Sequence, residues 1–406
     1  MQTLMDPAIC ADPHALYRDL RRDAPVMRTG NMVVVSRREE AESVFKQPNL
    51  YSSAMEATSL GNVRPLIPLQ IDPPDHIRYR RILDPLFAPR RMAVLETRLT
   101  ELVSNLIARF KDRGHCDLVQ EFTVPFPSEV FLTMFGLPLD DLPIFLTMKD
   151  GIVRPPGSTR SEQAAHRRAT GSSIYTYFER VLEDRELDER ARDERGGAPG
   201  DDLISLFLTP AEDGSRLSHD EILDICYLML VAGLDTVSAS LECMFAHLAQ
   251  HPDDRRLLAT DAGAAAGAVE ELLRWETPVM GVARLATAET ELGGQPVHAG
   301  DQVSVLLGAT NLEPGGAVDH PEELDLRRVG NRHTAFGSGV HRCLGSHLAR
   351  LELRVALSEF HRQIPDYRLA PGTELTYSMG IRSIESLPLE FEPQSTLLSI
   401  RPDPGA

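Results

Sequence analysis

Cys343 lies in a loop whose neighbouring residues could stabilise a metal-binding thiolate. Residues 336–345 read FGSGVHRCLG, and apolar residues follow at helical spacing until Pro365. A thiolate at the start of a helix is stabilised by the helix dipole, so its pKa falls. Glycines at 337, 339 and 345 remove side chains around the sulfur, which lets backbone N–H groups and a flat cofactor approach it. The pattern predicts a metal-binding cysteine with His341 and Arg342 as nearby donors.

Two other roles for Cys343 are compatible with the residues alone. It could be a buried structural cysteine, or it could bind zinc together with His341 and His347. Structural zinc usually has four ligands, and no second cysteine lies near Cys343 in the sequence.

The strongest predicted helix runs from about Ser218 to His251. A capping box, Ser218 to Glu221, opens it, and Pro252 follows its end. Residues 225–234 are apolar on all sides, which indicates a buried core helix. Gly233, Asp235 and Thr236 then interrupt the apolar pattern. Burying such polar groups costs several kcal/mol unless they are used, or unless Thr236 bonds back to a carbonyl at a local kink.

Together these two stretches resemble the cytochrome P-450 family over nearly the whole chain. Residues 336–345 match its loop F-G-x-G-x-H/R-x-C-x-G at every fixed position, and AGLDT at 232–236 resembles its motif A/G-G-x-D/E-T. The resemblance implies that Cys343 is the axial ligand of haem b (iron protoporphyrin IX) and its only metal ligand, with Phe336 and Gly337 beside the cofactor. A thiolate ligand favours cleavage of the O–O bond.

On the other side of the haem, the same resemblance implies three catalytic residues. Gly233 would leave room for dioxygen, Thr236 would donate a hydrogen bond to the reduced dioxygen, and Asp235 would relay protons. The acid and alcohol pair favours oxygen activation driven by a reductant, because peroxide-driven members typically lack it.

Further motifs match family positions around the cofactor. Glu271 and Arg274 form the family's E-x-x-R pair, and Arg328 stands where a third, structural partner is expected. Residues 311–314 read NLEP where members often read N-R-D-P, a departure that concerns a local ion pair. The haem propionates would be held by cationic or hydrogen-bonding residues: His76, Arg80, Arg284 and His341.

The resemblance implies a mainly α fold with a small β region, the cytochrome P-450 fold, as a single large domain, residues 1–406, around a buried haem. We expect a mixed β region at about 1–70, a helical core at about 71–290, the haem-thiolate loop and its following helix at 336–364, and a short C-terminal tail at about 394–406. Periodicity predicts a strand over 32–35 and a surface helix over 91–111. Residues 151–159 are predicted to form a mobile connection, which the resemblance places in the substrate lid. Residues 183–200 are predicted to form a solvated helix end and loop.

Composition narrows the class and the compartment of the protein. The formal net charge of −18 opposes general attraction to nucleic acid or an anionic membrane. Five cysteines show no paired spacing, which predicts a reducing compartment and no disulfides. The sequence shows no basic, apolar leader and no run of about 18 apolar residues, so we expect a cytoplasmic protein without a membrane span.

The expected function is therefore a monooxygenase that inserts one atom of dioxygen into a small hydrophobic molecule: a terpenoid, steroid, fatty acid or aromatic. Electrons would come from NAD(P)H through a separate ferredoxin and ferredoxin reductase, because no flavin or iron–sulfur module is visible in the chain. The ferredoxin would dock near exposed basic residues: Arg342, Arg80, Arg81 and Arg350. A peroxygenase, an oxidative coupling enzyme and a non-catalytic haem-binding protein are the alternatives.

The substrate pocket is expected, by resemblance, to use mostly apolar segments. These are the loop before His76, the region of Pro155, a helix face near Leu230 and Leu234, and residues 279–281 and 380–381. Arg64 could pair a substrate carboxylate or be an exposed loop arginine.

Overall fold

The computed structural model describes residues 7–55, 60–195, 197–198, 200–211, 213–315, 318–378 and 380–393. Contacts between residues divide the chain into two compact units. Unit 1 comprises Met1–Tyr51, Met92–Phe126 and Thr236–Ala406, and unit 2 comprises Ser52–Arg91 and Pro127–Asp235. Each unit draws on separate stretches of the chain, so the single domain over 1–406 stays a prediction. The predicted tail, 394–406, lies outside the described residues.

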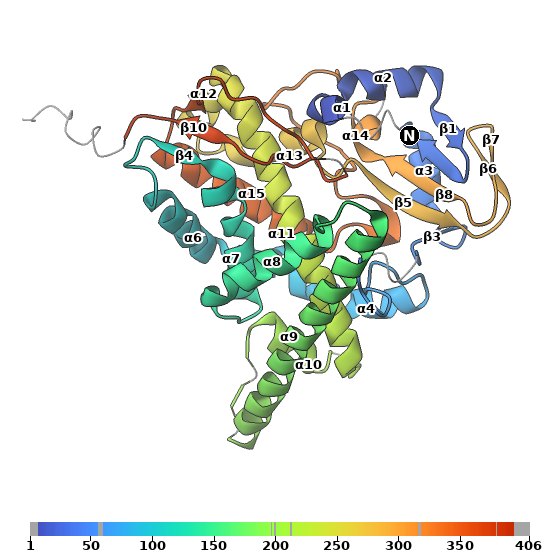
Figure 1. Cartoon of the computed structure of the whole chain (residues 1–406), viewed down its shortest axis with the longest axis vertical. Helices are drawn as coiled ribbons and strands as arrows, with labels where there is room; N and C mark the ends of the chain where they lie inside the picture. Colours follow the sequence, from blue (N-terminus) through green and yellow to red (C-terminus); the bar gives the residue numbers. More distant parts are fainter. Residues whose placement is uncertain are drawn as a thin grey trace, which may run out of the picture. The chain divides into compact units, whose positions relative to one another are not determined.

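The main sheet of unit 1 has the strand order β1-β2-β8-β5-β3. Its strands are β1 (Val26–Thr29), β2 (Met32–Val35), β8 (Gln302–Leu306), β5 (Gly281–Ala286) and β3 (Tyr51–Ser52). β2 pairs with β1 antiparallel and with β8 parallel, whereas β5 and β8 are antiparallel (Figure 1). Val33, Val35, Val303 and Val305 are fully buried in the core, as β-branched residues on a packed sheet face commonly are. The predicted strand over 32–35 is confirmed.

Two smaller sheets complete the β structure of unit 1. One has the order β4-β10-β9, with β4 (His115–Asp117), β10 (Pro388–Glu390) and β9 (Arg368–Leu369), and the other pairs β6 (Thr290–Leu292) with β7 (Gln295–Val297). The helices of this unit are α1 (Pro7–Ala11), α2 (His14–Asp23), α3 (Arg38–Lys46), α6 (Glu96–Ala108), α12 (Pro252–Thr260), α13 (Ala264–Glu276), α14 (Leu307–Asn311), α15 (Ser346–Gln363) and the short helices η3 (Val119–Thr123) and η5 (Gly339–His341). α15 packs against α6, α12 and α13.

Unit 2 is helical. It holds α4 (Asp75–Leu83), η2 (Asp84–Phe87), most of α7 (Pro125–Met134), η4 (Leu139–Asp141), α8 (Leu142–Val153), α9 (Arg160–Glu194) and α10 (Leu203–Leu208), while α5 (Pro89–Ala93) lies at the division. α8 packs against α9, where the ring of Phe145 meets that of Tyr177 edge-on at 5.0 Å between centroids. A full capping box between Thr159 and Glu162 opens α9.

The long helix α11 (His219–Gln250) confirms the prediction over about 218–251. Its capping box is present: the Glu221 N–H donates to Ser218 Oγ at 3.3 Å, and the Ser218 N–H donates to Glu221 Oε2 at 2.7 Å. Among the described residues, α11 is the one helix long and apolar enough to cross a membrane, although the sequence reading found no such run. Its most apolar window is 72% buried, as in a helix that forms part of a protein core.

Two helix boundaries differ from prediction. The helix expected over 91–111 is two helices, α5 and α6, separated by a turn in which Val94 is 81% exposed. α8 continues through Gly151 to Val153, so the connection is shorter than expected. The solvated helix end predicted within 183–200 is confirmed: α9 remains helical to Glu194, where ion pairs one turn apart, such as Arg192 with Glu189, support an exposed charged helix.

Candidate functional site

The loop around Cys343 is fixed by backbone hydrogen bonds. The Cys343 N–H donates to the Phe336 carbonyl at 2.9 Å, and the Arg342 N–H donates to the Gly339 carbonyl at 3.1 Å. The Cys343 side chain is exposed, whereas the other four cysteines are buried and none forms a disulfide. α15 begins at Ser346, so an exposed thiol precedes a helix N-terminus, as the sequence predicts.

Two glycines shape this loop. Gly339 has φ +71°, and a Cβ there would lie 2.3 Å from the carbonyl oxygen of Phe45 at the end of α3, so only glycine permits this close approach. Gly337 also has a positive φ, but a Cβ there would meet nothing within 4 Å. A Cβ at Gly345 would also meet nothing within 4 Å. An exposed thiol beside open space on a rigid loop fits a flat metal cofactor held through Cys343.

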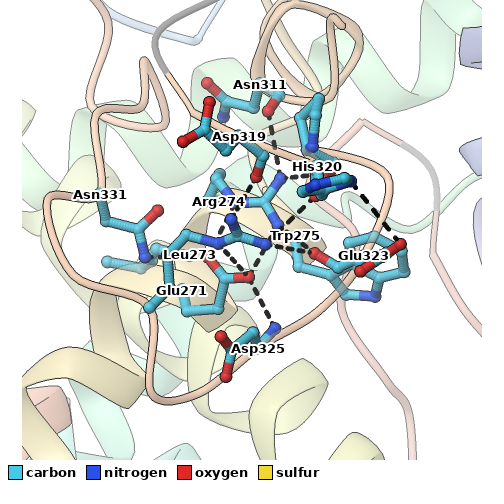
Figure 2. Close-up of polar contacts among 12 residues, drawn as sticks. Glu271, Leu273, Arg274, Trp275, Asn311, Asp319, His320, Glu323, Asp325 and Asn331 are labelled. Carbon is cyan, nitrogen blue, oxygen red and sulfur yellow. Dashed lines mark hydrogen bonds and ion pairs between the residues drawn. The ribbon is translucent and has the colours of Figure 1, made fainter.

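Glu271 of α13 is the centre of a buried ion network (Figure 2). Arg274 donates to both of its carboxylate oxygens at 2.8 Å, and Arg328 Nε donates to Oε1 at 3.1 Å. The Asp325 N–H and Asn331 Nδ2 add hydrogen bonds of 2.9 and 2.8 Å. Burial alone would raise the pKa of Glu271, but these partners outweigh it and lower the pKa to about 2. The predicted trio is confirmed as a structural anchor, whereas Asp325 and Asn331 were not predicted.

The NLEP stretch has its own contacts in unit 1. Glu313 accepts a hydrogen bond from the backbone N–H of Arg38 at 2.5 Å. Asn311 Oδ1 accepts one from the Thr334 N–H at 2.7 Å, shortly before the Cys343 loop. The departure from the family pattern therefore leaves this region tied to α3 and to the loop.

A second network, around Glu270, was not predicted. Arg350 of α15 donates to Glu270 Oε1 and Oε2 at 2.6 and 2.9 Å, and His333 Nε2 lies 3.2 Å from Oε2. Burial would raise the pKa of Glu270, but His333 and Arg350 lower it to about 2. The Arg350 guanidinium lies 4.4 Å from the centre of the Phe336 ring. Arg350 therefore ties the loop to α13, and its part in ferredoxin docking stays a prediction.

The accessible face of α11 differs from the predicted one by about one residue. Leu230 and Leu234 are buried in the core, whereas Ala232 and Gly233 are exposed and Met229 and Thr236 partly exposed. The spacing of these accessible residues defines one helix face. A Cβ at Gly233 would touch only the Phe131 ring, at 4.0 Å, so there is free space beside this glycine.

Asp235 is a buried carboxylate held by two cations within unit 2. Its side chain is 2% exposed, and its Oδ1 lies 3.0 Å from Arg154 Nη1 and 3.5 Å from Lys149 Nζ. Arg154 Nη2 reaches Oδ2 at 3.4 Å. A buried carboxylate needs such partners, but the sequence contained no signal for them because they lie more than 80 positions away in α8 and just after it.

The predicted propionate partners are divided between the units. His76 and Arg80 lie on α4 of unit 2, where His76 is buried, and burial and then the Arg80 charge lower the pKa of His76. Arg80 pairs with Asp84 at 2.7 Å. Arg284 on β5 and His341 in η5 belong to unit 1, as do Cys343 and Thr236, whereas Gly233 and Asp235 belong to unit 2.

The structure also bears on the proposed pocket segments, on Arg64 and on the zinc alternative. Val279 and Ile381 form an antiparallel bridge, so two of the proposed pocket segments meet within unit 1. Arg64 is a loop arginine whose side chain is 36% exposed and pairs with Asp224 at 2.9 Å and Asp220 at 3.1 Å. Its pairing with a substrate carboxylate stays a prediction. Among the described residues, no three His, Cys, Asp or Glu side chains could hold a metal ion together, which contradicts the zinc alternative.

Comparison with known proteins gives a consistent result. A family model described as cytochrome P450 matches residues 25–259 and 265–363. The steroid C26-monooxygenase of Mycobacterium tuberculosis is 31% identical over 395 residues and the vitamin D(3) 25-hydroxylase of Pseudonocardia autotrophica 32% identical over 400, each match covering 95% of both chains. The crystal structure of CYP109E1 from Bacillus megaterium in complex with testosterone superposes with a TM-score of 0.84 at 25% identity, covering 95% of this chain and 100% of that chain.

Proposed function

Because the chain belongs to the cytochrome P450 family and is a monooxygenase with that family's fold, we propose that it hydroxylates a hydrophobic small molecule of the steroid class with electrons from NAD(P)H. The observation that carries the proposal is the exposed thiol of Cys343, which stands beside open space on a rigid loop directly before α15. The thiols of the other four cysteines are buried.

The residues present fit a haem bound through Cys343. Haem supplies the iron centre at which dioxygen is reduced, and Cys343 would hold it through its thiolate. Phe336 and Gly337 would lie beside it, as proposed from the sequence. As proposed from the sequence, the propionates would be bound by charged and hydrogen-bonding side chains: His76, Arg80, Arg284 and His341.

The middle of α11 would supply the acid chemistry. Gly233 leaves free space, and Thr236 lies on the same accessible face, where its hydroxyl can donate a hydrogen bond. Asp235 would move protons, but its carboxylate is bound by Arg154 and Lys149. It must therefore loosen these contacts before it can donate or accept a proton elsewhere.

A steroid is favoured over the other hydrophobic substrates by the similar proteins. Two of them are named as a steroid C26-monooxygenase and a vitamin D(3) 25-hydroxylase, and two structures of one neighbour hold corticosterone and testosterone. The chain's own proposed pocket segments are also apolar. They include Val279, Met280 and Ile381. Terpenoids, fatty acids and aromatics share this apolar character and remain the comparison set for a substrate screen.

Electrons would arrive from a separate ferredoxin and ferredoxin reductase, as the resemblance to the soluble bacterial members of the family implies. Arg342 is exposed on the Cys343 loop and would contribute to docking. Arg350, which is paired with Glu270, would lie on the same basic surface.

The first experiment is the absorption spectrum of the dithionite-reduced protein with and without carbon monoxide. We expect the strongly red-shifted Soret band of a thiolate-bound haem, lost in Cys343→Ser. The matched control is Cys116→Ser, which changes a buried cysteine of β4 and should keep the band. A normal band in folded Cys343→Ser protein would refute the assignment.

The second experiment tests the reaction. Testosterone is incubated with the enzyme, NADH, a ferredoxin system and ¹⁸O-labelled dioxygen, and the products are analysed by mass spectrometry. One labelled oxygen atom per product is expected of a monooxygenase. Product formed only with added peroxide would instead identify a peroxygenase, and haem binding without any product across the substrate set would favour a non-catalytic haem protein.

A further inference from the structure

Arg382 is a buried cation that lies outside the Cys343 loop and outside the networks of Glu270 and Glu271. It is 4% exposed and forms an ion pair with Glu276, the last residue of α13, which is itself only 8% exposed. Its remaining N–H groups donate to carbonyl oxygens, including that of Ala11 at 2.9 Å and that of Cys10. The Tyr377 ring lies 4.8 Å from its guanidinium. All of these residues belong to unit 1.

The backbone of Arg382 is held as firmly as its side chain. The Arg382 N–H donates to the Pro278 carbonyl at 2.8 Å, directly beside the bridge between Val279 and Ile381. On the other side, the thiol of Cys243 in α11 donates to the Arg382 carbonyl at 3.1 Å. One residue therefore joins the N-terminal segment, the end of α13, the 380s segment and α11. We call Glu276, Pro278 and Arg382, with the carbonyls of Cys10 and Ala11, the Arg382 clasp.

The turn between Glu276 and Val279 is also constrained. Thr277 has φ +37°, in the left-handed region that β-branched residues rarely adopt. Its hydroxyl donates to the carbonyl of Arg274 at 2.9 Å and accepts a hydrogen bond from Asn311 Nδ2 at 3.0 Å. Such a conformation persists only where the surroundings determine it, so the direction of the chain leaving α13 is fixed by tertiary contacts.

We infer that Glu276 and Arg382 are positioning residues that hold segments 279–281 and 380–381 as one fixed wall of the substrate pocket. The inference rests on the proposed function, which assigns these segments to the pocket. The two segments meet at a single bridge, which is too little to fix their geometry in isolation. The buried ion pair and the carbonyl contacts supply the missing constraint. The clasp thereby determines which ligand shapes the wall accepts, although it touches no ligand itself.

The test uses two probes that bind haem iron directly and differ in size. Imidazole is small, whereas 4-phenylimidazole carries a ring that must fit the pocket wall. Glu276→Gln removes the charge while keeping the shape of the side chain. We expect the Kd for 4-phenylimidazole, measured by spectral titration, to change about tenfold, with the Kd for imidazole unchanged within about twofold. A variant that was merely less stable would shift both or neither.

The matched control is Asp301→Asn, which removes the charge of another buried carboxylate in unit 1, paired with Arg28. It should leave both azole affinities unchanged. Amide hydrogen exchange gives a readout independent of haem: peptides covering 276–283 and 378–385 should exchange faster in Glu276→Gln and not in Asp301→Asn. Should Glu276→Gln fail to fold, Arg382→Lys, which keeps the charge but has fewer donors, is measured in the same way.

Equal effects on the two azoles, or unchanged exchange in both peptides, would overturn the role of the clasp. The proposed function fails differently. If wild-type protein showed no thiolate-haem spectrum, the pocket assignment would fall, while the exchange data would still report whether Glu276 holds the two segments together.

Discussion

Glu352 is a buried carboxyl group in α15, on the helix that follows the Cys343 loop. It is 3% exposed, and its Oε2 has no hydrogen-bond partner among the described residues. Burial raises the pKa of Glu352 well above its ordinary value, because it favours the neutral form of the carboxyl group. Seven residues later in the same helix, Glu359 has the opposite setting, because hydrogen bonds from Arg362, Ser104 and Gln363 lower its pKa to about 2.

This contrast predicts opposite pH effects for two matched variants. The pKa of Glu352 is raised in the folded state, so its contribution to stability is present at low pH and is lost as pH rises towards the folded pKa. Glu352→Gln should therefore match wild type in urea unfolding at pH 5 and exceed it by about 1–3 kcal/mol at pH 8.

Glu359→Gln is the control, because a lowered folded pKa gives stability that is present above the unfolded pKa and lost in acid. This variant should be less stable than wild type at pH 8, and the difference should shrink towards pH 3. Equal pH dependence of the two variants would contradict the burial of Glu352 as the cause.

Asp235 makes a second prediction at this scale, about catalysis. If its carboxylate moves protons, Asp235→Asn should slow product formation about 100-fold, the range typical of lost acid–base catalysis, and increase the solvent isotope effect. Asp150→Asn is a close control. Asp150 contacts the same Lys149 and Arg154 at 3.0 and 3.4 Å, but its side chain is 56% exposed. Turnover of Asp235→Asn at the wild-type rate would remove the carboxylate from the mechanism.

At the scale of elements, α13 connects two regions through adjacent carboxylates. Glu271 binds the loop carrying Asp325, Arg328 and Asn331, whereas Glu270 binds Arg350 of α15. A helix places consecutive residues about 100° apart, so one short segment can anchor two different neighbours. The stability of the Cys343 loop therefore depends on α13 as well as on its own glycines.

Glu271→Gln tests this anchor. The pKa of Glu271 is lowered from an ordinary 4.5 to about 2. At about 1.4 kcal/mol per pKa unit, the hydrogen bonds and ion pairs of Glu271 together contribute about 3 kcal/mol. Because the folded pKa is depressed, this contribution is present above pH 4.5 and is lost as pH falls towards 2. At pH 7 the free energy of unfolding of the variant, measured with urea, should be lower by about 3 kcal/mol, and the variant should release haem faster. At pH 3 the difference in the free energy of unfolding should be smaller. Equal stability at pH 7 would contradict the network.

Sequence patterns predicted helices correctly where the residues that start and end a helix lie close together in the sequence. α11 follows from its capping box, its apolar middle and Pro252, all of which act within a few residues. The break between α5 and α6 was missed because the apolar residues on both sides of it keep the same helical period. The face of α11 near Leu230 and Leu234 was expected from the resemblance alone, because apolar residues continue all around this helix and periodicity does not choose a side.

The candidate site shows the same limit. Glu271, Arg274 and Arg328 were predicted to form one cluster because residue type and spacing in the sequence define their motif. The partners of Glu270 and Asp235 were not predicted, since Arg350 meets Glu270 across 80 positions of sequence and Arg154 meets Asp235 across 81. Such contacts depend on tertiary packing, which one sequence does not reveal without the folded structure.

At the scale of the whole molecule, net charge and local charge have opposite signs near the proposed electron entry point. The chain carries a formal charge of −18, yet an exposed arginine, Arg342, directly precedes Cys343. An acidic ferredoxin would be repelled by the molecule as a whole and attracted by this spot. The attraction by Arg342 acts at short range, whereas the repulsion by the net charge acts at long range. Added salt should therefore weaken the attraction and the repulsion to different extents.

Electron transfer from an acidic ferredoxin, measured by stopped flow, tests this balance. Raising the salt from about 50 to about 300 mM should slow association several-fold if local attraction dominates, because screening removes it. Arg342→Glu should lower the rate about tenfold at low salt and abolish that salt dependence. Arg256→Glu on α12, where the arginine side chain is 69% exposed, makes the same change in net charge. Equal slowing by both variants would show that only the total charge matters, whereas slowing by Arg342→Glu alone would place the docking site beside the Cys343 loop.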